Sequence, residues 1–150
     1  MRVEYVEAVL EVVERIPAGS VLEVVERIPA GSVLSYGDVA DLLGAGGARQ
    51  VGTAMSRYGS AVPWWRVLRA GGHAPKGLEA EALTHYLQEG TPLRGDYLRF
   101  AGMGEGRWRV DLTAARWVPS EEDLDALDLI AEHLETSLRK LSVANDGITE

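Results

Sequence analysis

The sequence has 150 residues, of which 46% are hydrophobic and 25% charged, so it is long enough for one globular domain with one hydrophobic core. It contains no cysteine, which excludes disulfide bonds, a thiol nucleophile and cysteine-ligated zinc. The net charge of −8 argues against nucleic acid as a partner if the charge is spread evenly, because acids repel phosphates.

The charge is not spread evenly along the chain. Residues 33–117 hold ten basic and eight acidic groups, whereas residues 118–150 hold two basic and nine acidic groups. Nearly all cations of the middle segment are arginines, which pair with phosphate and stack on bases better than lysines do. The middle segment is therefore able to carry a basic face, and most of the acidity belongs to the C-terminal part.

Other patterns exclude further classes of protein. The three histidines, His73, His85 and His133, lie far apart in sequence, so we expect no metal site and no cofactor. Glutamates interrupt the apolar residues near the N-terminus, so we expect no signal peptide. No apolar run approaches the roughly 20 residues that span a bilayer, so we expect no membrane partner. Together these patterns predict a soluble, cytoplasmic protein.

A repeat occupies the first part of the chain. Residues 9–20 read VLEVVERIPAGS, and residues 21–32 repeat the same letters. Each copy predicts a short amphipathic helix that Pro and Gly end. One domain needs this helix once, and we favour residues 21–32 because their link to the next segment is then undisturbed. Residues 1–20 then form a displaced helix; alternatively, residues 9–20 fill the core and the second copy bulges out. A displaced apolar helix needs a partner, so monomer and dimer both stay open.

The next segments predict two short helices joined by a tight loop. A turn or short extended piece at 35–37 precedes a helix over 38–43, and the glycine-rich loop 44–47 leads to a helix over 48–58. Helix, turn and helix is the outline of a helix-turn-helix, although by itself this outline is more typical of an ordinary helical hairpin.

The second half of the chain predicts a helix over 78–89 and a possible hairpin within 97–112 that turns around the glycine-rich residues 102–106. An amphipathic acidic helix follows over 120–141, with Ser120 as its N-cap. The last nine residues of the chain are expected to lack regular structure.

Three segments in this order carry a resemblance to a known family. They are IPAGSVLSYGDVA (28–40), ARQVGTAM (48–55) and PWWRVLRAGG (63–72), and GLEAEALTHYLQEG (77–90) follows them. As a set they resemble the C-terminal domain of the O6-alkylguanine-DNA alkyltransferases, over residues 21–117. The resemblance implies a mainly α, winged-helix or helix-turn-helix-like DNA-binding domain with a small β-hairpin and, here, an added C-terminal helix.

The resemblance also divides the chain. Residues 21–117 are expected to be the DNA-binding domain, residues 1–20 an N-terminal helix with the first repeat copy, and residues 118–150 an acidic helix and tail. This acidic part has three interpretations. It could repel DNA and so weaken non-specific binding, or it could dock a protein partner. The favoured interpretation is a helix folded back on the domain with a solvated acidic face.

One departure from the enzymes decides the expected activity. The enzymes carry Pro-Cys-His-Arg-Val at the reactive site, whereas here Trp64 stands in place of the cysteine and Trp65 in place of the histidine. The alkyltransferase-like proteins also have Trp in place of the cysteine, so the chain resembles that family. Without nucleophile and base there is no covalent route, and we expect no enzyme. Glu89, which matches the acid that orients the histidine, is interpreted as a remnant or an ordinary helix-end charge.

The resemblance implies non-catalytic recognition of O6-alkylguanine in double-stranded DNA, by nucleotide flipping. It also implies that the protein flags the lesion for nucleotide-excision repair proteins, working at the nucleoid in the cytoplasm. The alternative is a protein-interaction module of the same fold that has lost lesion binding. In that alternative, Trp64 and Trp65 have collapsed into the pocket and filled it.

The resemblance assigns roles to four residues, one in the turn before the two short helices and three in the second helix. Tyr36 matches the tyrosine that presses on the phosphate of the flipped nucleotide. Arg49 matches the arginine that replaces the lost base in the stack, as a planar guanidinium can. Gly52 and Ala54 are small and let the helix backbone approach the minor groove. The structural alternatives are a half-buried core tyrosine, a solvated arginine, and close packing of the small residues against the core.

Five further residues belong to the reactive segment and the loop after it. Trp64 and Trp65 would lie at the pocket, where the indole face of Trp64 suits an alkyl group and can stack on a base. Arg66 is expected to hold the local backbone beside the lesion. Arg69 and Lys76 border the glycine-rich loop and could contact phosphate or the lesion base.

Overall fold

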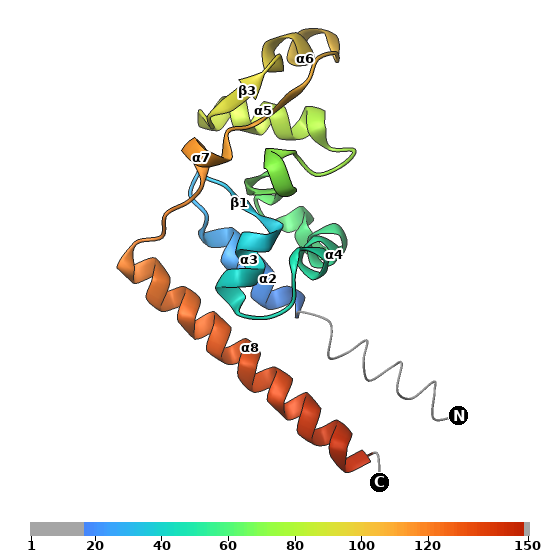
Figure 1. Cartoon of the computed structure of the whole chain (residues 1–150), viewed down its shortest axis with the longest axis vertical. Coiled ribbons are helices and arrows are strands. Elements are labelled where there is room, and N and C mark those ends of the chain that lie inside the picture. The colour runs from blue at the N-terminus through green and yellow to red at the C-terminus, as the bar shows by residue number, and fades with distance from the viewer. Residues whose placement is uncertain (1–16, 149–150) are drawn as a thin grey trace, which may run out of the picture.

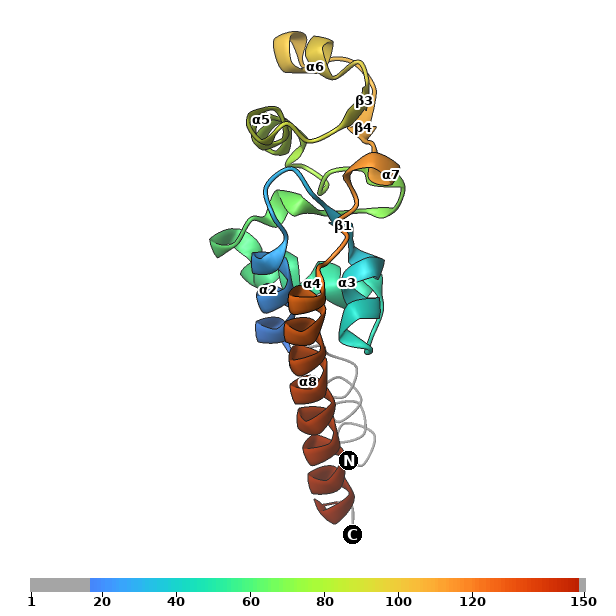
Figure 2. The same cartoon turned by 90° about the vertical axis from the view of Figure 1, so that its left-hand side faces the viewer.

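The computed structural model describes residues 17–148, and the side chains of residues 17–140. Three helices, α2, α3 and α4, form the lower layer of the domain, and the hairpin β3–β4 with α5 and α6 lies above them (Figure 1). The long helix α8 runs along the lower layer and projects beyond it, which both views show (Figures 1 and 2). The predicted mainly helical fold with a small hairpin and an added C-terminal helix is confirmed.

Helix α2 (Ala18–Arg27) carries the second repeat copy into the core. Its residues Val21, Val24 and Val25 are fully buried, and Ile28, which follows it, is 1% exposed. The copy that we favoured from the sequence therefore fills the core. The first turn of α2 comes from the end of the first copy, so the boundary expected between residues 20 and 21 falls inside a helix. The rest of the displaced helix expected over 1–20 lies outside the described residues.

Helices α3 (Tyr36–Leu43) and α4 (Ala48–Tyr58) form the helix-turn-helix outline. Helix α3 begins two residues earlier than predicted, because Ser35, which was expected in the turn, is its N-cap. The amide of Asp38 donates to Ser35 Oγ at 3.0 Å, and the amide of Ser35 donates to Asp38 Oδ2 at 2.9 Å. This reciprocal capping box fixes the first turn, which contains Tyr36.

We expect Ser35→Ala to lower the free energy of unfolding by about 1 kcal/mol, because it removes the acceptor for the Asp38 amide. Urea unfolding measures this change. Ser137→Ala, in the exposed interior of α8, is the control: alanine is the better helix former there, so stability should stay equal or rise slightly. An equal effect of both changes would mean that the cap does not hold α3.

Two short parallel strands connect the helix-turn-helix to the reactive segment. Strand β1 (Leu34–Ser35) pairs with β2 (Val67–Leu68), with Leu34 opposite Val67. Strand β1 runs directly into α3, and β2 directly follows the turn of residues 64–66. The pairing of the two strands therefore fixes the distance between the helix-turn-helix and the reactive segment.

The expected hairpin has a different first strand from the one that the sequence predicted. Strand β4 (Trp108–Val110) pairs antiparallel with β3 (Leu93–Gly95), and the helix α6 (Tyr97–Met103) fills the connection. The prediction of a first strand within residues 97–101 was wrong, whereas β4 lies where the second strand was expected. The segment LRFA favours a helix, which Gly104 ends in the left-handed region at φ +70°.

The core forms two clusters. One lies between α2, α3, α4 and α8, and the other lies under the hairpin, against α5 (Glu79–Glu89) and the short helix α7 (Leu112–Ala115). Trp64 is partly buried and packs against both clusters. The reactive segment therefore lies at the junction of the two clusters, and its position depends on both of them.

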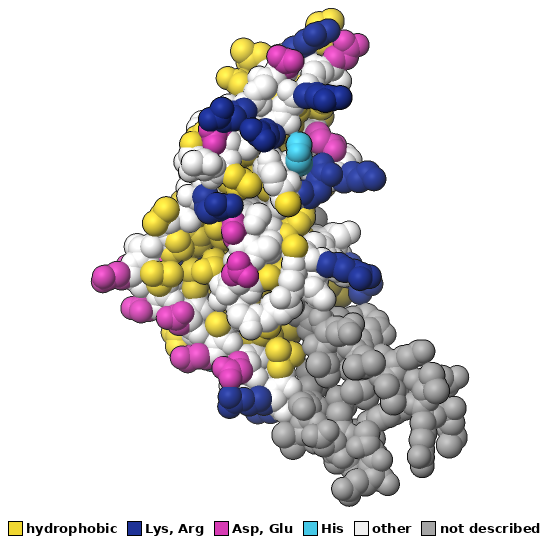
Figure 3. Space-filling view, in the orientation of Figure 1, with side chains coloured by type: hydrophobic (Ala, Val, Ile, Leu, Met, Phe, Trp, Pro, Cys, Tyr) yellow, Lys and Arg dark blue, Asp and Glu magenta, His cyan; other side chains and the backbone are white. Residues whose placement is uncertain are grey.

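Helix α8 (Glu121–Ile148) folds back on the domain. Leu127, Ile130 and Leu134 are buried, and α8 packs against α2 and α3. Acidic side chains line the visible face of α8, whereas Lys and Arg side chains gather over the upper part of the molecule (Figure 3). The favoured interpretation of the acidic part is confirmed.

Helix α8 begins where the sequence predicted but extends further than predicted. Ser120 caps the helix, since Asp123 donates its amide to Ser120 Oγ at 3.1 Å. The prediction that the last nine residues lack regular structure was wrong for residues up to 148, because neither Pro nor Gly interrupts the helix before Gly147. Within the described residues, no helix is long and apolar enough to cross a membrane.

Candidate nucleic-acid interface

A cavity of about 530 Å³ lies where α3, α4, the turn of residues 64–66 and the loop before α5 meet. Five of the nine predicted site residues line it: Tyr36, Gly52, Trp64, Arg69 and Lys76. The lining residues that sequence reasoning missed are Met55, Ser56, Gly59, Ser60, Pro75, Leu78 and Glu81. Of these, Ser56, Gly59 and Ser60 follow Gly52 at helical spacing, a signal that was present in the sequence.

Tyr36 and Gly52 form the wall on the side of the two short helices. A Cβ atom on Gly52 would lie 3.9 Å from the ring of Tyr36, so the ring rests over the α4 backbone. Burial raises the pKa of the Tyr36 phenol, and the neighbouring charge of Arg69 offsets part of this rise. The hydroxyl therefore stays protonated at neutral pH and is able to donate to a phosphate oxygen.

Trp64 forms the opposite wall. Its ring meets the ring of Trp65 edge to face, with centroids 5.6 Å apart, and meets His85 in the same way at 6.0 Å. These two neighbours hold the indole of Trp64 from behind. The cavity stays open beside Trp64, which contradicts the alternative in which two tryptophans fill the pocket.

Trp65 supports the cavity from outside, which corrects its predicted place at the pocket. Its ring stacks on His85 with centroids 3.5 Å apart and an interplanar angle of 5°. Its Nε1 donates to Glu89 Oε1 at 2.9 Å, and its carbonyl oxygen accepts from the Tyr86 hydroxyl at 2.6 Å. Trp65 is therefore fixed by three neighbours and does not line the described cavity.

Glu89 joins three parts of the chain, so its interpretation as a remnant or an ordinary helix-end charge is wrong. Its carboxylate accepts from the Gly31 amide at 3.1 Å, from Trp65 Nε1 and from Arg66 Nη2 at 2.6 Å. Arg66 also donates to the Ile28 carbonyl at 2.9 Å. Arg66 therefore holds backbone, as predicted, but its second predicted role as a lesion contact is not supported because both ends of its guanidinium are used inside the protein.

The charge states of Arg66 and Glu89 follow from their burial and their hydrogen bonds. The side chains of Arg66 and Glu89 are only 15% and 12% exposed. Burial by itself would raise the pKa of the Glu89 carboxyl, but the hydrogen bonds from Arg66, Gly31 and Trp65 outweigh it and lower the pKa below the usual 4.5. Glu89 is therefore charged at neutral pH.

The comparisons with known proteins show which proteins this chain is similar to. Residues 19–89 match the family described as 6-O-methylguanine DNA methyltransferase, DNA binding domain. The matched segment runs from α2 to the end of α5 and includes both short helices and the reactive segment. The resemblance to the methyltransferase family that the sequence motifs indicated is therefore confirmed.

Two solved structures of alkyltransferase-like proteins from S. pombe are similar to this chain. One is Atl1 in complex with damaged DNA containing O6-carboxymethylguanine, with 29% identity and a TM-score of 0.55. The other is ATL in complex with DNA, with 28% identity and a TM-score of 0.54. Each comparison covers 68% of this chain and 94% of the other chain. The comparison with curated protein sequences found no match.

Helix α4 is the candidate recognition helix of this methyltransferase-type domain. Val51, Ala54 and Met55 point into the core. Arg49 is exposed in the first turn and makes no salt bridge within the described part of the chain. Ala54 is 5% exposed, so its predicted place at the DNA surface is wrong. Residues two apart on a helix point about 200° away from each other, so Gly52 and Ala54 cannot share a face.

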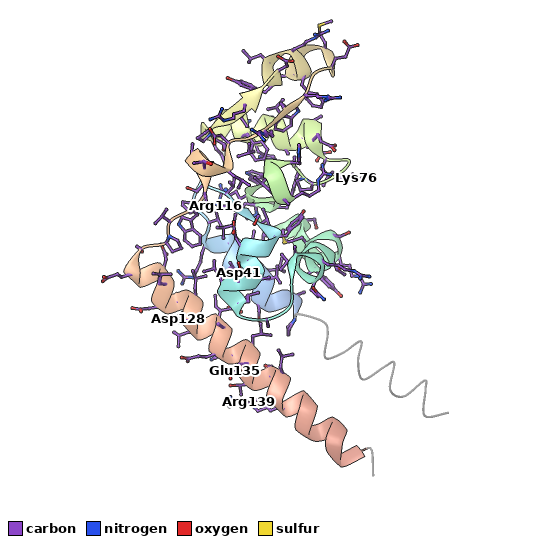
Figure 4. All side chains as sticks on the ribbon, viewed as in Figure 1. Asp41, Lys76, Arg116, Asp128, Glu135 and Arg139 are labelled. Atoms are coloured by element: carbon purple, nitrogen blue, oxygen red, sulfur yellow. The ribbon has the colours of Figure 1, made fainter. Side chains whose placement is uncertain are left out.

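The loop of the domain after the reactive segment brings two cations to the cavity. Arg69 Nε donates to the Ala74 carbonyl at 2.8 Å, which closes the loop on itself. Lys76 lies on the edge of the molecule away from α8 (Figure 4). No group of three or more metal-ligating side chains occurs among the residues that the structure covers.

Proposed function

We propose that this protein recognises O6-alkylguanine in double-stranded DNA, takes the flipped nucleotide into the cavity beside Trp64, and transfers no alkyl group. The observation that supports this proposal is an open cavity at the position where the related enzymes carry their cysteine, with an indole there instead. A cavity of about 530 Å³ is within the size range of small-molecule sites, roughly 300–1,000 Å³.

The residues around the cavity suit the parts of a flipped nucleotide. Trp64 offers an aromatic face for the base, and the hydroxyl of Tyr36 can donate to the phosphate. Gly52 lines the cavity beside Tyr36 without a side chain, so it leaves room there for the nucleotide. Arg49 at the start of α4 is the residue we propose to enter the stack in place of the lost base.

The absence of catalysis is proposed on chemical grounds. The chain contains no cysteine, and an indole cannot accept an alkyl group by displacement at neutral pH. Atl1, with which the chain shares 29% identity, is seen in complex with DNA that contains O6-carboxymethylguanine. The rival function, an interaction module with a filled pocket, is disfavoured by the open cavity.

A competition titration at about 0.15 M salt tests the proposal, with one duplex that contains O6-methylguanine and the same duplex with guanine. We expect at least a tenfold preference for the lesion, or about 1.4 kcal/mol. Equal affinities would contradict lesion recognition. We further propose that the bound protein flags the lesion for nucleotide-excision repair at the nucleoid. In a reconstituted excision assay, it should raise incision only of the modified duplex.

The role proposed for Arg49 gives a sharper test. We expect Arg49→Lys to weaken binding of the lesion duplex about tenfold, because an ammonium group keeps the charge but cannot fill the space of a base in the stack. Arg57→Lys, on the same helix and equally charged, is the control and should change affinity less than twofold. Equal effects would assign Arg49 a phosphate contact and no place in the stack.

A further inference from the structure

The duplicated segment extends two residues beyond the repeat itself. Residues 9–22 and residues 21–34 both read VLEVVERIPAGSVL. The second of these segments begins within α2 and ends at Leu34, the first residue of β1. The chain therefore contains, a second time, the whole sequence of a core helix and of the turn that joins this helix to β1.

The core holds α2 through side chains that the earlier copy also contains. Helix α2 packs against α4 and α8 (Figure 2). Four of its buried residues, each at most 1% exposed, have identical counterparts twelve positions earlier: Val21, Val24, Val25 and Ile28 correspond to Val9, Val12, Val13 and Ile16. Arg27, whose Nη1 lies 3.5 Å from Asp123 Oδ1, corresponds to Arg15. The core therefore does not distinguish the two copies by their side chains.

The turn after α2 is a place where extra residues can leave the domain. Pro29 and Ala30 are exposed, whereas Val33 and Leu34 are buried and pair with neighbouring backbone. If residues 9–16 took the place of residues 21–28, the next twelve residues would form a loop at this exposed turn. The chain from Gly31 onward would keep its contacts. The entropic cost of closing a loop rises only slowly with its length, so such a loop is tolerable at the surface.

The residues before the two copies differ, and this difference favours the described register. Helix α2 begins with the residues AGS (18–20), and Ala18 packs against the core. The earlier copy follows the residues VEA (6–8), so Val6 would take the place of Ala18 and bring a larger side chain to a packed position. Together with the loop, this makes the exchanged register the less stable of two accessible arrangements.

We propose that α2 is a register switch, in which residues 9–16 replace residues 21–28 in the core of the same chain and the domain stays folded. Exchange within one chain is favoured over exchange between chains. A copy that enters a partner's core expels the partner's own copy, so the pair buries no additional apolar surface. The switch allows the chain to withdraw either copy from the core without losing the fold.

A charge placed in one copy at a time tests the switch in the full chain. Val24→Asp puts a carboxylate into the core in the described register, and a chain without the switch would lose its fold. In the exchanged register, Val12 takes this place. We therefore expect Val24→Asp to keep a cooperative melting transition about 10 °C below that of the wild type. Val12→Asp is the matched control and should melt close to the wild type. The double variant Val12→Asp/Val24→Asp should show no cooperative transition.

A thiol reports which copy is buried. The chain contains no cysteine, so Val13→Cys or Val25→Cys introduces a unique thiol at equivalent positions of the two copies. Adding Val24→Asp should slow the reaction of the first thiol with an aromatic disulfide reagent at least about tenfold and should accelerate that of the second, because reaction requires local opening of the core. Neither measurement uses DNA, so the result is independent of lesion recognition.

Four results would overturn the inference. Val24→Asp that melts like the double variant would mean that the earlier copy does not replace the second. A double variant as stable as Val24→Asp would mean that the core accepts the carboxylate in place. Unchanged reactivity of the Val13→Cys thiol would mean that no exchange occurs. Val24→Asp that sediments as a dimer and loses its fold on dilution would assign the exchange to two chains.

Discussion

Glu89→Ala should lower the free energy of unfolding by about 3 kcal/mol. Removing this carboxylate leaves the guanidinium of Arg66, only 15% exposed, without its counter-ion. It also leaves the Gly31 amide and Trp65 Nε1 without their acceptor. Because Glu89 joins the end of α2 to the reactive segment, the loss affects both cores. Urea unfolding monitored by tryptophan fluorescence measures the change.

A second ion pair in this chain provides a matched control. Arg139 Nη2 lies 2.6 Å from Glu135 Oε1, the same distance as between Arg66 and Glu89, but the two side chains are 77% and 62% exposed. Water solvates these charges in both the folded and unfolded states, so Glu135→Ala should cost less than about 0.5 kcal/mol. Similar losses at the two positions would mean that burial does not determine the importance of Glu89.

The pH dependence of the Glu89 contribution follows from its lowered pKa. A carboxyl with a lower pKa in the folded state than its usual 4.5 binds protons more weakly when folded, so it stabilises the protein above that value. The stabilisation is lost as the pH falls through the lowered pKa. The stability gap between the wild type and Glu89→Gln should therefore be constant from pH 7 to about pH 5 and should narrow below it. A gap that stays constant to pH 3 would contradict this sign.

Trp64→Ala should reduce the affinity for an O6-methylguanine duplex about tenfold or more. The indole is the aromatic wall of the cavity, and stacking of a base on such a ring contributes roughly 1–3 kcal/mol. Trp64→Phe keeps an aromatic face and should retain most of the preference for the lesion over guanine. Competition titrations with the two duplexes measure both variants.

Trp64 also packs against both cores, so Trp64→Ala can weaken binding by destabilising the whole protein. This effect has to be separated from the loss of the aromatic wall of the cavity. Trp108→Ala is the matched control: Trp108 packs against the core under the hairpin but does not line the cavity. It should lower the melting temperature and leave the lesion preference unchanged when binding is measured well below that temperature. A loss of preference in both variants would assign the effect to destabilisation.

The features that the sequence predicted correctly depend on near neighbours. Helix α4 has the bounds that the pattern gave, 48–58, because its apolar residues recur at helical spacing and glycines flank it. The capping of α8 by Ser120 is also local, since the partner Asp123 is three residues away. The lack of a thiol nucleophile follows from the composition alone, because the chain contains no cysteine.

The features that the sequence left wrong or undecided depend on distant parts of the chain. Glu89 looked like a remnant because its partner Gly31 lies 58 residues away, and no local pattern signals that contact. The sequence also left open whether Trp64 and Trp65 fill the pocket. In the structure, Trp65 stacks on His85 and donates a hydrogen bond to Glu89, so its ring lies outside the cavity.

By itself, then, the sequence determined the bounds of α4, the cap of α8, the resemblance to this type of domain and the loss of the reactive cysteine, since spacing and residue chemistry encode them locally. Only the tertiary structure showed that the second repeat copy packs into the core and that Gly52, and not Ala54, faces the cavity. Both depend on how one helix face packs on others, and identical or similar side chains do not distinguish the possibilities until the packing is known.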